Sequence, residues 1–157
     1  MHVEGNREDR VRAGLITGAL AASATAGAVL GIALPEHYSP FAAAGRQVLA
    51  TLAPSTTPSG VVATFAGLVL HTVIAFFWAF LFVAIAGRAR GVRLGITAVA
   101  SSVVIWALNA WLASSVLRFG NDLTAFPAQA LLFYTVLAAG LVGGIALARV
   151  EGGTKGT

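Results

Sequence analysis

The chain contains no cysteine and carries very little charge. Without cysteine it forms neither a disulfide framework nor a thiolate metal site. Charged residues make up 10% of its 157 residues, whereas about a quarter is usual for soluble domains. A soluble domain of this length needs far more charge on its surface, so the composition indicates a protein that resides in a membrane.

Residues that carry catalytic or ion-coupling chemistry are also scarce. No Asp, Glu, Lys or Arg falls inside a long apolar run, although ion-driven pumps usually carry such residues at depth. The His-Glu-x-x-His pattern of zinc proteases and the Gly-x-Ser-x-Gly pattern of serine hydrolases are both missing. Haem held by two histidines is not expected, because His71 alone lies within an apolar run. We therefore expect neither enzymatic activity nor a bound metal or cofactor.

Four long apolar runs are what the sequence does contain, and the strongest covers residues 61–86. This run is uncharged and exceeds the ~20 residues that a helix needs to cross ~30 Å of hydrocarbon. The other runs cover 13–34, 94–117 and 126–148. The sequence thus predicts an all-α integral membrane four-helix bundle over residues 13–148, with polar tails at 1–12 and 149–157.

The first run permits a second interpretation, that of a cleaved signal peptide. Arg12 precedes it, and it is rich in small residues. However, it is longer than the usual apolar region of about 7–15 residues, and no clear cleavage site closes it before Pro35. We expect this helix to be retained.

The connection between the first two runs contains a shorter helical pattern. Residues 40–52 place Phe41, Ala44, Val48 and Leu52 at helical spacing. A helix of this length is too short to span a bilayer, so we expect an amphipathic helix in the interface. It either caps the bundle or acts as a lid or partner surface.

The basic residues predict the orientation in the membrane. With the N-terminus in the cytoplasm, the turn at 87–93 is also cytoplasmic and carries Arg88, Arg90 and Arg93. The full cytoplasmic set is Arg7, Arg10, Arg12, Arg88, Arg90, Arg93, Arg149 and Lys155, against Arg46 and Arg118 outside. The positive-inside rule therefore favours both termini in the cytoplasm, in a membrane of the bacterial inner-membrane type. Nucleic acid is not an expected partner, because no helix face is basic and no aromatic platform is present.

Glycines mark the faces on which the helices are expected to pack. Small residues spaced four apart allow the backbones of two membrane helices to approach closely. The glycines expected at such contacts are Gly14, Gly18, Gly27, Gly31, Gly67, Gly140 and Gly144.

Polar residues within the runs fall at a similar depth. At a rise of 1.5 Å per residue, they lie roughly 12 to 15 Å from the outer ends of their helices. The layer consists of Thr25, His71, Asn109, Tyr134 and Thr135. An unsatisfied polar group in hydrocarbon costs several kcal/mol, so we expect His71 to form a hydrogen bond with Asn109.

Two interpretations of this layer remain open at the level of sequence. It either holds the helices together by hydrogen bonds, or it lines a ligand or ion pathway in which His71 is the ionisable group. Binding of a quinone or lipid near His71, Trp78 and Tyr134 is a further option. The expected function is a non-enzymatic accessory or interaction protein that contacts the lipid bilayer and forms a homo-oligomer or joins a larger membrane complex. The alternative is a small channel or transporter.

Overall fold

The structure is a computed structural model that describes residues 3–33, 39–53, 59–112 and 127–153. All regular elements in these ranges are α-helices: α1 (Val3–Ala33), α2 (Pro40–Leu52), α3 (Gly60–Ala86), α4 (Gly91–Leu112) and α6 (Pro127–Gly153). All of them except α2 are long and apolar enough to cross a membrane. The predicted all-helical class is confirmed, and so is the prediction of four helices long and apolar enough to cross a membrane.

Two of the long helices extend further than predicted. The predicted tail at 1–12 is helical from Val3 onward, and α6 continues beyond Arg149 to Gly153. Glu and Arg are good helix formers, and no proline interrupts either stretch. Because α1 has 31 residues, it is about 46 Å long and exceeds the thickness of the hydrocarbon. Helix α4 begins three residues earlier than predicted, and the predicted continuation over 113–117 lies outside the described residues.

Local signals in the sequence explain where α2, α3 and α4 begin. The hydroxyl of Ser39 accepts a hydrogen bond from the Ala42 amide at 3.3 Å, and the hydroxyl of Ser59 accepts one from the Val62 amide at 3.4 Å. Such side chains satisfy amides that have no partner within the helix. Gly91 opens α4 with a φ of 52°, a left-handed conformation that glycine adopts without steric cost.

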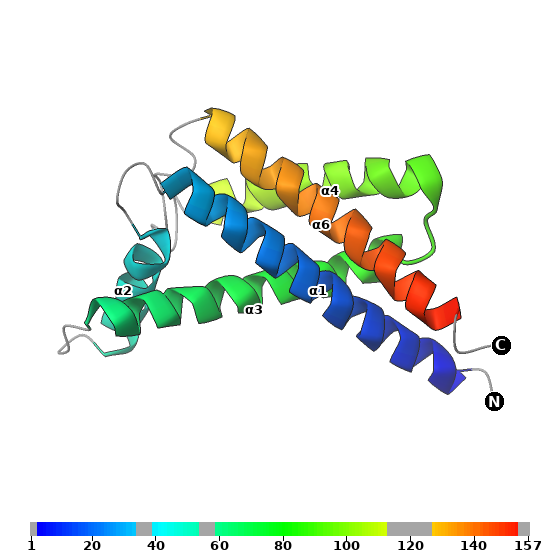
Figure 1. Cartoon of the computed structure of the whole chain (residues 1–157), viewed down its shortest axis with the longest axis horizontal. Coiled ribbons are helices and arrows are strands. Elements are labelled where there is room, and N and C mark those ends of the chain that lie inside the picture. Colours follow the sequence, from blue (N-terminus) through cyan, green and yellow to red (C-terminus); the bar gives the residue numbers. More distant parts are fainter. Residues whose placement is uncertain (1–2, 34–38, 54–58, 113–126, 154–157) are drawn as a thin grey trace.

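The helices pack in an antiparallel order around α1. Helix α1 lies against both α6 and α3, α2 lies against α3, and α4 lies mainly against α6. Figure 1 shows the two ends of the chain and the α3–α4 turn at the same end of the molecule. The seven described arginines of α1, α4, α6 and this turn gather near that end, whereas Arg46 lies on α2 near the other end.

Five of the seven glycines predicted to pack do so within the chain. Gly14 and Gly18 lie against the rings of Phe80 and Phe76 on α3. The remaining three contact neighbouring backbones: Gly140 lies at Ala21, Gly144 at Thr17, and Gly67 at the Phe41 carbonyl.

The packing predicted for Gly27 and Gly31 is not found within the chain. Both residues are exposed on α1. A Cβ built on either would have no atom of the described chain within 4 Å. These two glycines share their spacing with the glycines that pack, and they differ only in facing away from α3 and α6.

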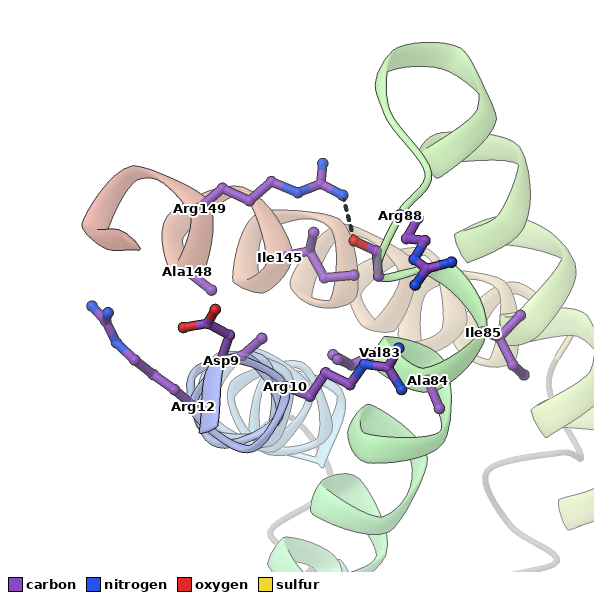
Figure 2. Close-up of a pocket in the computed structure, with 12 residues that line it drawn as sticks. Asp9, Arg10, Arg12, Val83, Ala84, Ile85, Arg88, Ile145, Ala148 and Arg149 are labelled. Atoms are coloured by element: carbon purple, nitrogen blue, oxygen red, sulfur yellow. Dashed lines mark hydrogen bonds between the residues drawn. The ribbon is translucent and has the colours of Figure 1, made fainter. Parts of the chain in front are cut away.

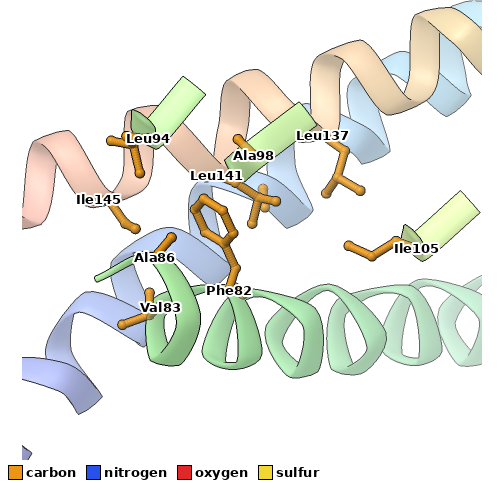
Figure 3. Packing of buried hydrophobic residues seen from close by; sticks show 11 residues of the cluster. Phe82, Val83, Ala86, Leu94, Ala98, Ile105, Leu137, Leu141 and Ile145 are labelled. Carbon is orange, nitrogen blue, oxygen red and sulfur yellow. The ribbon is translucent and has the colours of Figure 1, made fainter. Parts of the chain in front are cut away.

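The buried core joins α3 to α4 and α6. Phe82 of α3 is 1% exposed and is the largest fully buried side chain among the described residues. It belongs to one cluster with Leu94, Ala98 and Ile105 of α4 and Leu137, Leu141 and Ile145 of α6 (Figure 3). Large apolar side chains elsewhere on α3, such as Phe65, Val73 and Phe77, are exposed. That exposed face suits contact with lipid.

Helix α2 is confirmed over the predicted residues, and its first half packs closely against α3. Gly45 meets the Ala63 carbonyl, and the Phe41 carbonyl meets Gly67, so α2 and α3 run antiparallel at close range. The Phe41 ring also contacts the His71 ring edge to face at 5.5 Å. Leu52, expected on the apolar face of α2, is 75% exposed, because the contact with α3 involves the first half of the helix.

Candidate functional site: polar pairs between the helices

His71 on α3 forms its hydrogen bonds with α1. Its Nε2 lies 3.0 Å from Thr25 Oγ1 and 3.3 Å from the Ala22 carbonyl oxygen. Thr25 is 1% exposed, and its hydroxyl also lies 2.7 Å from the Ala21 carbonyl oxygen. His71 and Thr25 therefore tie α3 to α1 where the two helices cross.

These contacts define the direction of the hydrogen bonds. A carbonyl oxygen only accepts, so the short contact with Ala21 makes the Thr25 hydroxyl the donor there. The hydroxyl oxygen is then left to accept from His71 Nε2–H, and the Ala22 carbonyl accepts from the same group. The arrangement places a proton on Nε2 of His71. A ring that donates to a hydroxyl already bonded within its own helix suits a structural tie.

A second polar pair joins α4 to α6. Asn109 Nδ2 donates to the Tyr134 hydroxyl oxygen at 3.4 Å, and both residues are half-buried. The Tyr134 ring also stacks edge to face on Phe133, with 5.0 Å between centroids. Each helix of the α4–α6 contact thus contributes one polar side chain, as in the α1–α3 contact.

The prediction of a hydrogen bond between His71 and Asn109 is wrong. Each of these side chains bonds to a different helix, because α1 lies along the face of α3 that carries His71. Thr135 does not join the layer either: it is exposed on α6, next to Tyr134. The predicted layer thus consists of two separate pairs, Thr25 with His71 and Asn109 with Tyr134.

The predicted site residues do not include several polar residues that lie at the helix contacts. Thr17 Oγ1 and Ser102 Oγ are buried and have no hydrogen-bond partner in the part of the chain that the structure describes. Arg149 of α6 donates from Nη2 to the carbonyl oxygens of Gly87 at 3.0 Å and Ala89 at 2.6 Å. Arg149 thereby fastens α6 to the turn after α3. Its position at the end of an apolar run, level with that turn, was the available signal.

The polar pairs do not line either of two pockets found among the described residues. Within the described ranges there is no group of three His, Cys, Asp or Glu side chains that could hold a metal ion. One pocket lies among α1, α3 and α6 near the chain ends, and another lies on α4 between Val92 and Ala100. Neither pocket is lined by His71 or Asn109. The geometry therefore supports hydrogen bonding between helices as the role of these residues.

A double-mutant cycle is expected to find energetic coupling between His71 and Thr25. His71→Phe removes the donor and keeps an aromatic ring beside Phe41, and Thr25→Val removes the acceptor without a large change in volume. Hydrogen bonds between membrane helices contribute about 0.6 kcal/mol and at most about 1.7 kcal/mol, so we expect a coupling free energy in this range. Unfolding in mixed micelles, followed by circular dichroism, measures the four free energies.

The matched control pairs His71→Phe with Asn109→Leu. These residues share no hydrogen bond, so their effects should add to within about 0.5 kcal/mol. Strong coupling in the control together with none between His71 and Thr25 would contradict the observed pairing.

Comparison with protein-family models, with curated proteins and with solved structures finds no match for this chain.

Proposed function

We propose that this chain is a four-span membrane bundle that acts without enzymatic activity, as an interaction protein that associates with further copies of itself. The observation that supports this most directly is the unused glycine pair of α1. Among the glycine pairs predicted to pack, Gly14/Gly18 of α1 and Gly140/Gly144 of α6 contact neighbouring helices, whereas Gly27/Gly31 of α1 faces outward.

The open glycine pair belongs to a longer stripe of small residues. Ala19, Ser23, Gly27 and Gly31 are spaced four apart on α1, and all four are exposed. In Figure 1, α1 crosses in front of α3. In lipid, the stripe offers a shallow face on which the backbone of another helix can approach closely, and dispersion contacts then hold the pair.

A second copy of the chain is the occupant that we propose for this stripe. Two α1 helices that cross at their small residues form an isologous contact, in which the same stripe serves on both sides. The stripe carries no charge, so the contact leaves no ion unpaired in hydrocarbon. A symmetric dimer would bury the small residues of this stripe on both copies.

Self-association is expected to weaken at least tenfold when Gly27 is replaced by leucine, because the larger side chain keeps the two α1 helices apart. Energy transfer between donor- and acceptor-labelled chains in liposomes, measured against dilution in lipid, gives the dissociation constant. Gly95→Leu is the matched control, since Gly95 on α4 also has open space at its Cβ position. Monomeric wild-type chains, or equal dissociation constants for the wild type and Gly27→Leu, would refute the proposal.

The basic residues support an orientation with both chain ends in the cytoplasm. Arg88 and Arg90 lie in the α3–α4 turn, at the same end of the molecule as Arg7 and Arg149. Cytoplasmic segments of membrane proteins carry such an excess of Arg and Lys. The chain has no cysteine, so a single Arg90→Cys substitution provides a unique label. We expect an impermeant thiol reagent to modify this cysteine only after the membrane is opened. Labelling in intact cells would indicate the opposite orientation, with both chain ends outside the cytoplasm.

A further inference from the structure

A pocket rich in arginine lies at the end of the molecule where the chain begins and ends. It has a volume of about 570 Å³ and is formed by α1, the end of α3 and α6. Its charged lining consists of Asp9, Arg10, Arg12, Arg88 and Arg149. In Figure 2, Arg10 extends toward the end of α3, where Arg88 lies, whereas Asp9 and Arg12 lie on the side facing α6.

The pocket has an excess of positive charge. Four guanidinium groups and one carboxylate line it, which leaves a net charge of +3, and arginine stays protonated throughout the physiological range. Arg149 donates to two backbone carbonyl groups, and these bonds do not neutralise its charge. The side chains of Arg10 and Arg88 have no hydrogen-bond or ion-pair partner among the residues that the structure describes. The pocket therefore attracts an anion that accepts several hydrogen bonds.

The other walls of the pocket are apolar and lead onto the lipid-facing surface. Val83, Ala84 and Ile85 of α3 and Ile145 of α6 line it. Ile85 is 65% exposed, so the apolar wall is continuous with the outer face of α3. A ligand that fits both parts has a negatively charged group and an apolar chain.

We propose that this pocket binds the phosphate group of an anionic phospholipid, with an acyl chain lying along the outer face of α3. Guanidinium groups bind phosphate oxygens through paired hydrogen bonds, and basic pockets between membrane helices on the cytoplasmic side bind anionic headgroups. Arg10 and Arg88 provide the donors, one from α1 and one from the turn after α3. The inference rests on the proposed placement of the chain in a membrane, but not on its self-association.

The test compares lipids that differ only in the headgroup. Purified full-length protein in a neutral detergent is titrated with phosphatidylglycerol or with phosphatidylcholine of the same acyl chains, and native mass spectrometry and thermal unfolding record binding. We expect phosphatidylglycerol to bind at least tenfold more tightly than phosphatidylcholine and to raise the melting temperature. Inorganic phosphate at the same concentration should produce no such rise, because it lacks the apolar chain.

Matched variants distinguish binding of the lipid in this pocket from a general attraction of anionic lipid to basic residues. Arg10→Gln combined with Arg88→Gln should lower the affinity for phosphatidylglycerol at least tenfold. Arg90→Gln combined with Arg93→Gln removes the same charge outside the pocket lining and should lower it less than threefold. If the first combination does not fold, Arg88→Gln alone provides the comparison and should still exceed Arg90→Gln in its effect.

Several outcomes would overturn the proposal. Equal binding of the two lipids would exclude recognition of the anionic headgroup, and equal losses in the two variants would exclude this pocket. Stabilisation by inorganic phosphate alone would identify a free anion rather than a lipid as the ligand. Failure of the chain to insert into liposomes at all would instead refute the membrane placement on which the inference rests.

Discussion

Replacing Gly144 with leucine is expected to lower the free energy of unfolding by about 3 kcal/mol, at the upper end of the usual cost of overpacking. A Cβ at Gly144 would collide with the Cα atom of Thr17 and would lie 2.9 Å from both its Cβ and its Oγ1. Thr17 is completely buried, and the obstacle is partly backbone, so a change of rotamer cannot relieve the clash. The two helices would have to separate, and α1 and α6 are the pair in most extensive contact within the described residues. Unfolding in mixed micelles, followed by circular dichroism, measures the loss.

Gly27→Leu provides the control for this prediction. The same substitution is made on a glycine of the same spacing, but a side chain there meets open space in the described chain. We expect the stability of the monomer to change by less than about 0.5 kcal/mol, as is usual for substitutions at exposed positions. Similar losses for Gly144→Leu and Gly27→Leu would show that the loss at Gly144 does not arise from the close contact between α1 and α6.

The sequence was sufficient to predict the long helices, because length and lack of charge are the properties that let a helix cross a membrane. Even the short helix α2 was predicted over the residues at which it occurs, since Pro40 begins a segment with helical spacing. The ends of α1 and α6 were predicted less well. A helix need not stop where it leaves hydrocarbon, so the first charged residue marks the edge of the apolar run and not the end of the helix.

The hydrogen-bond partners of the polar residues could not be predicted from the sequence alone. Position along a run gives a depth, and depth placed Thr25, His71 and Asn109 in one layer. Which neighbour a side chain meets depends on the order of the helices, and α1 occupies the face of α3 that His71 presents. Long apolar helices do not have the polar face that identifies the exposed side of a helix in a soluble protein. For the same reason, sequence did not separate Gly27 and Gly31 from the glycines that pack.

Phe82 packs between α3, α4 and α6, where α3 makes few other contacts with the two neighbouring helices. Helix α3 has few close backbone approaches to α4 or α6, yet Phe82 is 1% exposed and clusters with Ala98 of α4 and Leu141 of α6. Its ring therefore fills the space that separates these three helices (Figure 3). The position of α4 relative to α3 therefore depends largely on this side chain, whereas α4 lies against α6 more extensively.

Phe82→Ala is consequently expected to cost roughly 2 to 3 kcal/mol of unfolding free energy, less than the most costly truncations of buried phenylalanine in soluble proteins. This cost is expected to be smaller than in a soluble protein for a physical reason. In lipid the unfolded helices are also surrounded by apolar groups, so the transfer term largely cancels and the cost of the cavity remains. Unfolding in mixed micelles gives the free energy, and a pair of spin labels on α3 and α4 reports whether the two helices separate.

Phe77→Ala is the matched control, five residues earlier on the same helix. Phe77 is 60% exposed, and lipid chains fill the space that its ring vacates, so we expect a loss below about 0.5 kcal/mol and no change in the distance between labels. The comparison distinguishes packing from hydrophobicity, because both variants remove the same apolar group from the same helix. If the two variants lose equal stability, the cluster around Phe82 does not position α4, and the α4–α6 contacts alone must hold that helix in place.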